Sequence, residues 1–491
     1  MPPADPDPNP SDPQSRPPRP EFELADPLAD QDRPAAAATD QDMLEYESPA
    51  GRAAHDPYAA LRIPAFRRFI SAFFLSAAGS QIQAAAVGWQ IYDRPGATAW
   101  DLGLLGLILA IPMLLLSLPA GQMADTFSRR KLFLFMQVST TFCATGLMIM
   151  AWLFDVPGDQ PWPPYLLWSM YGLLGLGAVG GTIGRPSREA LMAATVPASV
   201  YPNAVTWNST GFEISSMGGP AIGGLIVWLG GPGVAYAVAS VFFVVAFVLI
   251  LMLPEATPVP PSTAVPTSTD GPGRPKPAGL ADLMAGIRFV FRSKLILAAL
   301  TLDLFAVLFG GATFLLPIFA KDILNVGAFG FGCLRAAPAV GAVTMALVQA
   351  HLPPFKNAGR MLLWTVAGFG AATIVFGLSR NYALSFCMLV LTGAFDNISV
   401  VIRHSLVPLA TPDAMRGRVL AVNQIFVGSS NELGGLESGW TAYHFGPVAS
   451  VVGGGIASIL VVIGVAAKFP EVRRLKSLHD VKPIEDETSR A

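Results

Sequence analysis

The sequence predicts an all-α membrane protein with twelve transmembrane helices in two pseudo-symmetric six-helix halves, and three observations point to this fold class. Hydrophobic residues make up 52% of the 491 positions and charged residues only 13%, about half the charged fraction of a soluble protein. The apolar residues are gathered in runs of roughly 20, the length that spans a bilayer as a helix. The two halves of the chain also repeat each other in sequence.

The N-terminal tail, residues 1–62, differs from the rest of the chain. It opens with MPPADPDPNPSDPQSRPPRP, which is rich in proline and almost free of large apolar side chains. Such a segment cannot bury enough apolar surface to fold, so we expect it to be disordered. It contains no apolar stretch of the signal-peptide kind. The first membrane helix is therefore expected to direct insertion.

Run lengths place six spans in residues 63–254 and six in residues 295–468. Between the halves we expect a cytoplasmic linker, residues 255–294, whose polar, Pro-rich first part is followed by an amphipathic helix on a basic membrane face. Residues 469–491 form a cytoplasmic tail. The predicted spans are 66–92, 101–124, 132–154, 165–186, 203–229, 232–254, 295–319, 329–350, 360–378, 381–402, 417–441 and 448–468.

The distribution of lysine and arginine predicts the orientation. These residues are concentrated in the linkers after even-numbered spans and next to the membrane in both tails. The opposite linkers hold only Arg94, Lys321 and Arg380. The positive-inside rule then places both termini and the central linker in the cytoplasm, which requires an even number of spans.

The internal repeat runs through spans four and five of the first half and spans ten and eleven of the second. Identical residues keep one register, each pair being 403 − 188 = 215 positions apart, where chance similarity between glycine-rich helices would not keep it. Such repeats are typical of transporters built from parallel six-helix halves. The paired residues are Arg188 and Arg403, Leu191 and Leu406, Pro197 and Pro412, Asn208 and Asn423, Ser215 and Ser430, Gly219 and Gly434, and Gly224 and Gly439.

Span count, repeat and central linker resemble the major facilitator superfamily. The loop GQMADTFSRRK (121–131) resembles the superfamily signature at Gly121, Asp125, Arg129 and Arg130, although Thr126 and Ser128 depart from it. GGPAIGG (218–224) resembles the glycine–proline motif of antiporters. Residues 403–439 are similar to the bacterial branch of enterobactin-exporter-like proteins, also called transmembrane secretion effectors. The resemblance implies export by a secondary transporter of the bacterial inner membrane, without defining the substrate.

Five acidic residues are predicted inside the membrane. A charge at the bilayer centre costs about 2.5–3.5 kcal/mol, so these groups must face protein, water or a partner. In the superfamily fold, spans 3, 6, 9 and 12 are peripheral, and our predicted interiors of those spans carry no charge. The five acids are Asp303, Asp396, Glu213, Glu437 and Glu432.

These acids are candidates for proton coupling. Burial raises the pKa of a carboxyl group, so a sealed acid can hold a proton that it releases when water enters. Alternatively, each acid locks helix packing through hydrogen bonds to serine or asparagine. We favour the functional role for Asp303 and Asp396 and leave it open for Glu213.

Glu432 and Glu437 lie about 140° apart on one helix. Glu432 shares its face with Gly428, Gly435 and Gly439, which favours a role in a close helix–helix seam. Glu437 is expected nearer the outer vestibule.

Further polar residues are candidates for the substrate cavity or the cytoplasmic gate. The cavity candidates can equally well make hydrogen bonds between helices, and Arg335 can pair with a membrane acid. The gate roles are implied by the resemblance, and Arg188 and Arg403 can instead anchor the topology. The cavity candidates are Gln81, Gln83, Gln90, Arg335, Asn397 and Asn431, and the gate candidates are Gly121, Asp125, Arg129, Arg130, Arg188 and Arg403.

Several classes of function are excluded. The chain has no Gly-Lys pair and hence no P-loop, its histidines and cysteines lack metal spacing, and no nucleophile–base pattern appears. We therefore expect a monomeric, non-enzymatic protein without cofactor, metal, nucleotide or nucleic acid, whose partners are the bilayer and a small molecule. The leading hypothesis is a proton-coupled exporter (antiporter) of a siderophore or drug. The alternatives are a metabolite uptake symporter and a non-transporting receptor or assembly factor on the same fold.

Overall fold

The computed structural model describes residues 56–154, 162–253, 280–351, 356–477 and 481. The predicted tail up to residue 55 and the linker over 255–279 lie outside these residues, as do the side chains of Asp125 and Glu432. Residues 57–491 form one compact unit, and the fold described here is that of this unit.

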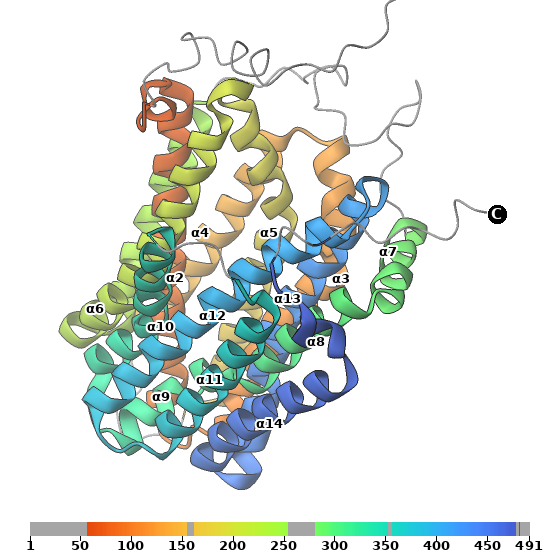
Figure 1. The fold of residues 1–491 in the computed structure, drawn as a ribbon. Coiled ribbons are helices and arrows are strands. Elements are labelled where there is room, and N and C mark those ends of the chain that lie inside the picture. The colour runs from red at the N-terminus through yellow and green to blue at the C-terminus, as the bar shows by residue number, and fades with distance from the viewer. Residues whose placement is uncertain (1–55, 155–161, 254–279, 352–355, 478–480, 482–491) are drawn as a thin grey trace, which may run out of the picture. The chain divides into compact units, whose positions relative to one another are not determined.

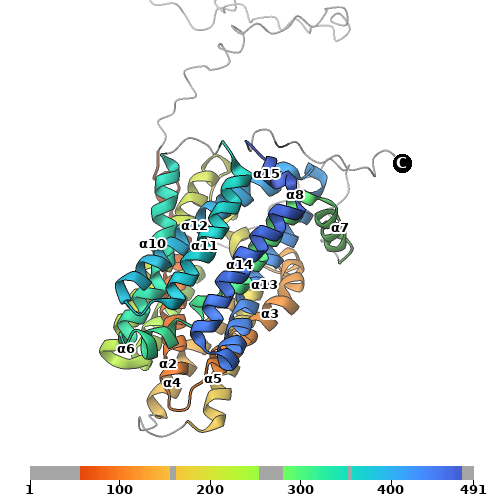
Figure 2. The same cartoon turned by 60° about the horizontal axis from the view of Figure 1, so that its bottom comes forward.

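Every regular element in the described residues is a helix, as predicted. The N-terminal helices are α2 (Pro64–Asp93), α3 (Ala99–Thr126), α4 (Arg129–Leu153), α5 (Pro164–Ala194) and α6 (Tyr201–Leu251). The C-terminal helices are α7 (Leu280–Arg292), α8 (Lys294–Phe309), α9 (Leu316–Ile318), α10 (Gly327–Ala350), α11 (Ala358–Leu378), α12 (Tyr382–Ala410), α13 (Asp413–Phe445), α14 (Pro447–Lys468) and α15 (Pro470–Arg474). Figures 1 and 2 show the long helices bundled side by side.

Ten helices in the described residues are long and apolar enough to cross a membrane. One of them, Ala198–Leu251, contains 54 residues and is long enough for two crossings. Its backbone breaks at Gly231, where φ is 78°. The 33-residue α13 is also long enough to cross a membrane and is not among the ten. These two features are consistent with the predicted count of twelve.

Two helices continue beyond their predicted ends. The predicted spans stop at residues 186 and 402, whereas α5 and α12 reach Ala194 and Ala410. Both stop just before the repeated prolines, Pro197 and Pro412, because the residue preceding proline disfavours helical backbone. The length of the apolar runs therefore located the apolar part of α5 and α12, whereas the prolines that follow determine where the two helices end.

The seventh span is broken, which the sequence did not predict. After α8, the chain passes through a 3-10 turn (Gly311–Thr313), α9 and a π-helix (Phe319–Ile323). A Cβ atom added at Gly311 would lie 2.7 Å from the carbonyl oxygen of Gly434, so α13 approaches this turn closely. Pro317 in α9 has no N–H and cannot continue a regular ladder of hydrogen bonds.

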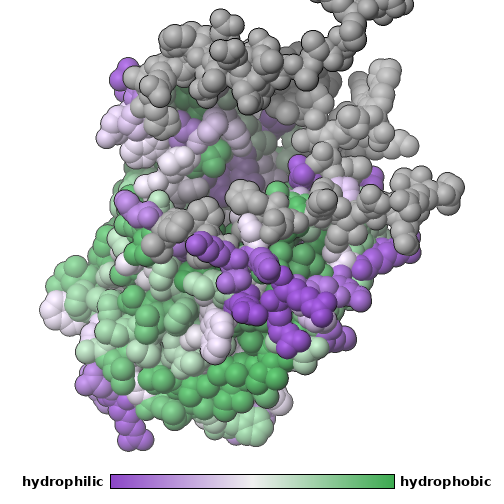
Figure 3. Space-filling view, viewed as in Figure 1, coloured by the Kyte–Doolittle hydropathy of each residue, from purple (hydrophilic) through white to green (hydrophobic). Residues whose placement is uncertain are grey.

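The N-terminal and C-terminal helices meet at one end of the bundle. We call the end where α2 and α8 begin the basic end, since Arg67, Arg129 and Arg292 lie there. The largest core cluster joins both helix groups at the opposite end of the bundle. It includes Trp89, near the end of α2, and Phe331, near the start of α10. The remaining large clusters each belong to one group alone. Figure 3 shows a hydrophobic band with hydrophilic side chains gathered above it.

Two glycine contacts hold the groups together at this opposite end. Added Cβ atoms at Gly103 of α3 and Gly224 of α6 would lie 3.0 Å and 2.8 Å from the Cα atoms of Gly439 and Gly332. Glycine lets helix backbones approach this closely, because any side chain would collide with the facing helix. Gly439 of the predicted glycine face of α13 therefore lies in a close seam with α3, whereas Gly428 and Gly435 face the side chains of Met113 and Phe314.

The predicted amphipathic helix is α7, which lies at the edge of the bundle in both views (Figures 1 and 2). Phe289 and Val290 are buried with Val422 of α13, while Met284 and Phe291 are exposed. The helix therefore packs on α13 and presents a second apolar surface.

Candidate functional site

Three predicted site residues come together between α8 and α12. Arg403 Nη1 forms an ion pair with Asp303 Oδ1, and Arg403 Nη2 lies 3.9 Å from Asp396 Oδ1. Arg403 Nε also donates to the carbonyl oxygen of Ser399 at 3.3 Å. Asp396 and Arg403 are seven residues apart on α12, which places them on one helix face. The guanidinium group is thus held between two carboxylates.

The two carboxylates differ in exposure. The side chains of Asp303 and Arg403 are 5% and 7% exposed, whereas that of Asp396 is 49% exposed. The pair of Asp303 and Arg403 is therefore sealed in the bundle. Asp396 remains accessible and is separated from the guanidinium group by more than a hydrogen-bond distance.

The three charged residues line a small open pocket, whose empty space together with the open solvent at its mouth is ≈ 260 Å³. Its walls come from α8, α11 and α12, which are all C-terminal helices. The cavity lies within the C-terminal group, not across the boundary between the two groups. Besides the charged residues, it is lined by Ala306, Val307, Thr365, Val366, Phe369, Phe395 and Ser399.

Arg188 occupies the position in the repeat that corresponds to Arg403, but it has different neighbours. Its guanidinium carbon lies 4.9 Å from the centre of the Phe73 ring. Its Nη2 atom is 3.7 Å from Oε1 of Glu189, whose side chain is 66% exposed. Arg188 thus rests on an aromatic ring of α2 in place of a buried carboxylate.

The structure does not bring the other acids to this cluster. Glu213 is partly buried on α6, and the nearby Ser215 donates its hydroxyl hydrogen to the carbonyl oxygen of Gly211. Glu437 is partly buried near the end of α13 and accepts a 3.3 Å hydrogen bond from Ser438. The Glu432 side chain lies outside the described residues.

Most of the polar cavity candidates make contacts between helices. Gln83 of α2 donates to Cys143 Sγ of α4 at 3.4 Å, and Gln81 lies 3.4 Å from the Ser216 hydroxyl of α6. Asn397 accepts a 2.8 Å hydrogen bond from Gln349. Asn431 donates within its own helix to the Val427 carbonyl, and Arg335 is partly buried on α10. These contacts match the alternative that the side chains join helices.

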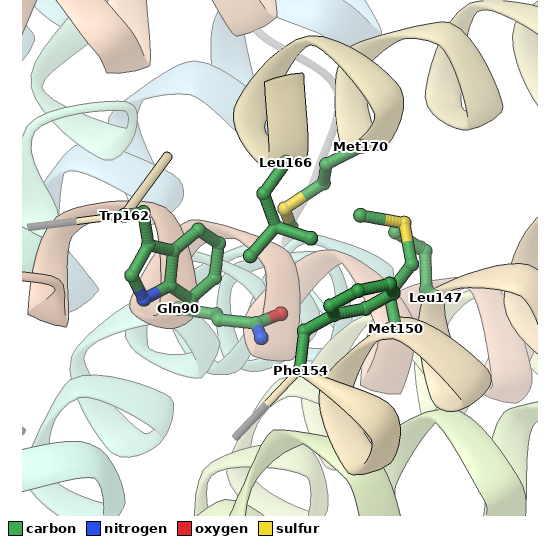
Figure 4. Close-up of a pocket in the computed structure, with 7 residues that line it drawn as sticks. All are labelled: Gln90, Leu147, Met150, Phe154, Trp162, Leu166 and Met170. Carbon is green, nitrogen blue, oxygen red and sulfur yellow. The ribbon is translucent and has the colours of Figure 1, made fainter. Parts of the chain in front are cut away.

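Gln90 lines a second small pocket among α2, α4 and α5 (Figure 4), whose empty space together with the open solvent at its mouth is ≈ 240 Å³. Its Oε1 atom accepts a 2.6 Å hydrogen bond from the Tyr236 hydroxyl. In Figure 4 the Gln90 amide lies between the side chains of Trp162 and Phe154. The other lining residues are Leu147, Met150, Leu166 and Met170.

The gate candidates Gly121, Asp125, Arg129 and Arg130 lie where α3 ends and α4 begins, at the basic end. Arg130 donates to the Leu251 carbonyl oxygen, and Arg68 donates to the Met252 carbonyl oxygen at 3.0 Å. Arginines here satisfy carbonyl groups that the end of α6 leaves unpaired. Arg129 is exposed, and a Cβ atom added at Gly121 would meet nothing within 4 Å.

Sequence reasoning missed a polar clamp at the opposite end, formed by Tyr92, Asp93, Lys321 and Asp322. Lys321 Nζ lies 2.9 Å from Asp93 Oδ1 and donates to the Asp93 carbonyl at 3.0 Å. The Tyr92 hydroxyl donates to Asp322, and Lys321 Nζ lies 5.9 Å from the Tyr92 ring centre. The clamp joins α2 to the π-helix that follows α9. A sequence signal for the clamp did exist. Asp93 and Arg94 follow the first span of one half, and Lys321 and Asp322 follow the first span of the other.

A family model described as transmembrane secretion effector matches residues 55–486. The chain belongs to this family of major facilitator transporters. It is 27% identical over 417 residues to the enterobactin exporter EntS of Shigella flexneri, covering 84% of this chain and 93% of that protein. It is equally similar to EntS of Escherichia coli O1:K1, covering 84% and 94%.

Solved transporters share the fold of this family member. A POT family transporter in complex with 5-aminolevulinic acid has a TM-score of 0.64 and 10% identity, covering 83% of this chain and 96% of that one. The D-xylose-proton symporter has a TM-score of 0.61 and 14% identity, with coverage of 85% and 100%. These neighbours show the major facilitator fold, and the chain is a membrane transporter of this type.

Proposed function

We propose that this transporter is a proton-coupled exporter of a small organic molecule such as a siderophore or drug. It acts in the bacterial inner membrane as a monomer, with the basic end in the cytoplasm and both termini on that side. Residues 63–254 and 295–468 are its two moving halves. The observation that carries the proposal is the different exposure of Asp303 and Asp396 on either side of Arg403.

Asp396 acts as the proton-binding group in this mechanism. While its cavity is open to water, the ionised carboxylate is solvated and Arg403 stays with Asp303. When the cavity closes, an unpaired carboxylate would lose its hydration, which is costly in a medium of low polarity. Asp396 then either binds a proton or draws Arg403 across the 3.9 Å separation and away from Asp303. In the second case Asp303 loses its partner and binds the proton in place of Asp396, so both responses link closure of the transporter to protonation.

Alternating access sets the direction in which protons and substrate move. Asp396 takes its proton from the acidic outer side as the outward-open cavity closes, and opening to the cytoplasm lets it release that proton into water. Substrate leaves on the outward-open step, so proton and substrate move in opposite directions. In the outward-open state, the signature loop with Asp125, Arg129 and Arg130 closes the cytoplasmic side. The clamp of Lys321 and Asp93 closes the outer side in the other state.

Transport into inverted membrane vesicles tests the proposal. Vesicles from cells expressing the protein receive an inside-acid pH gradient and a panel of labelled compounds that begins with enterobactin, because similar proteins are named as its exporters. We expect at least one compound to accumulate, with loss of accumulation on adding a protonophore. Gradient-driven movement out of the vesicles would instead indicate a symporter, and no movement across the panel would indicate a non-transporting protein.

A further inference from the structure

The two halves contain matched arginines whose contacts on the first membrane helix differ. The repeat also pairs Asp396 and Ser399 with Gly181 and Gly184. Phe73 is the tenth residue of α2, and Asp303 is the tenth residue of α8. Arg188 and Arg403 are the paired arginines of the repeat on α5 and α12. Each arginine contacts the tenth residue of the first membrane helix in its own half. The arginines are paired by the repeat, and their contacts stand at the same position counted from the start of α2 and α8.

With a phenyl ring in the place of the acid, Arg188 has only Glu189 as a charged partner within the described residues. Glu189 is adjacent to it on α5, is 66% exposed and lies 3.7 Å away, which is beyond hydrogen-bond length. A solvated ion pair of this kind contributes little. Phe73, by contrast, is only 2% exposed and provides a fixed surface under the guanidinium group.

The hydrogen-bonding groups of Arg188 are available as well. The guanidinium group carries five N–H donors, yet within the described part of the chain Arg188 makes no hydrogen bond. Its side chain is 24% exposed, and none of its nitrogen atoms belongs to the buried, unsatisfied atoms of this region. Arg403, in contrast, donates to Ser399 and pairs with Asp303.

We propose that Arg188 is the anion-binding group of the substrate site, and that the transported molecule is an organic anion with a planar ring. The guanidinium edge can donate two parallel hydrogen bonds to a carboxylate, and its planar faces stack on aromatic rings. One face of Arg188 already lies on Phe73, which leaves the edge and the second face for the ligand. This assignment rests on the proposed function, because it treats the site as one for transported substrate.

Binding of salicylate to the full-length protein in phosphatidylcholine nanodiscs tests this assignment. Salicylate carries a carboxylate on a planar ring, and salicylamide is its neutral match. Calorimetric titration of the wild-type protein should show saturable binding of salicylate at least tenfold tighter than that of salicylamide. Equal affinities, or no saturable binding of salicylate, would overturn the proposal.

Variants separate a ligand contact from a structural role. Arg188→Gln should weaken salicylate binding at least tenfold and leave salicylamide binding unchanged. Arg188→Lys, which keeps the charge without the planar fork, should weaken it about threefold and serves if the glutamine variant does not fold. Arg185→Gln is the matched control, because this exposed arginine lies one helical turn away, and it should change affinity less than twofold. Wild-type affinity in both Arg188 variants would contradict the assignment.

Failure of the anion site can be distinguished from failure of the proposed export function. Loss of salicylate binding in Arg188→Gln with no gradient-driven transport of any compound would retain the anion site and reject the exporter. Gradient-driven transport together with charge-independent binding would retain the exporter and reject the anion site.

Discussion

Arg403 of α12 and Asp303 of α8 form an ion pair that is almost completely enclosed, with 7% and 5% of the side chains exposed. Enclosure makes the two charges depend on each other, because removing one leaves the other buried without compensation. Asp396 stands beside this pair but remains 49% exposed. The predictions for the cluster follow from this difference.

Asp303→Asn should destabilise the protein strongly. The amide cannot neutralise Arg403, and breaking a buried pair costs on the order of 3 kcal/mol. We expect a clearly lower thermal unfolding temperature in nanodiscs. Combining Asp303→Leu with Arg403→Met should recover much of that loss, since the double variant contains no buried charge. A double variant less stable than Asp303→Asn would contradict the interpretation of the pair.

Asp396→Asn should leave the stability of the protein unchanged and impair transport. Its side chain is half-exposed, so the amide should leave the unfolding temperature nearly unchanged. Gradient-driven accumulation in inverted vesicles should fall at least tenfold, because the amide cannot bind and release a proton. Exchange of labelled for unlabelled substrate should persist, since it requires no net proton movement. Normal accumulation in Asp396→Asn would exclude this residue from coupling.

The clamp should respond to charge reversal. Asp93→Lys and Lys321→Asp each place like charges together at the opposite end, which disfavours the conformation that is closed there. Exposed pairs contribute about 0.2–1 kcal/mol, so loss of the pair in each reversal should shift the population of this conformation by a factor of about 1.4 to 5. The double reversal should restore it.

Spin labels on cysteines at Lys131 and Arg473, one in each helix group at the basic end, can report this shift. Their distance distribution should move toward shorter values in the single reversals and return in the double variant. Native cysteines are first replaced by alanine. A distribution that is identical in all variants would show that the clamp does not bias the conformation.

The seam at Gly439 should not accept a side chain. Gly439→Val would place methyl groups against the backbone of Gly103. Overpacking of this kind costs about 1–3 kcal/mol, so the unfolding temperature should fall. Gly464→Val is the matched control within a membrane helix, because a Cβ atom there would meet nothing within 4 Å. Equal effects of the two substitutions would indicate a general cost of valine in a helix and not a seam.

Much of the fold follows from the sequence because apolar run length and the repeat report directly on membrane crossing. Local signals do not locate the break in span seven, where Gly311 accommodates the backbone of Gly434. That contact depends on a helix more than a hundred residues away. The π-helix with Lys321 and Asp322 follows this break, so the clamp escaped prediction with it.

The candidate site was predicted residue by residue but not as a cluster. Asp303 and Asp396 were singled out because intramembrane acids are costly. Arg403 was assigned to the gate because the family resemblance implies that role, and the repeat pairs it with Arg188. Its pairing with Asp303 depends on how α8 and α12 are packed, which no pattern within either helix reveals. The glutamines of α2 were expected to face ligand or helix, and the structure directs them to other helices.

Proton movement in liposomes tests the central claim most directly. Purified protein is reconstituted with the pH-sensitive dye pyranine inside, and a gradient of the compound transported in vesicles is imposed without a pH gradient. We predict that substrate flowing one way drives protons the other way in the wild-type protein, and that this proton movement is absent in Asp396→Asn. Substrate flow without proton movement in the wild type, or undiminished proton movement in Asp396→Asn, would contradict the account.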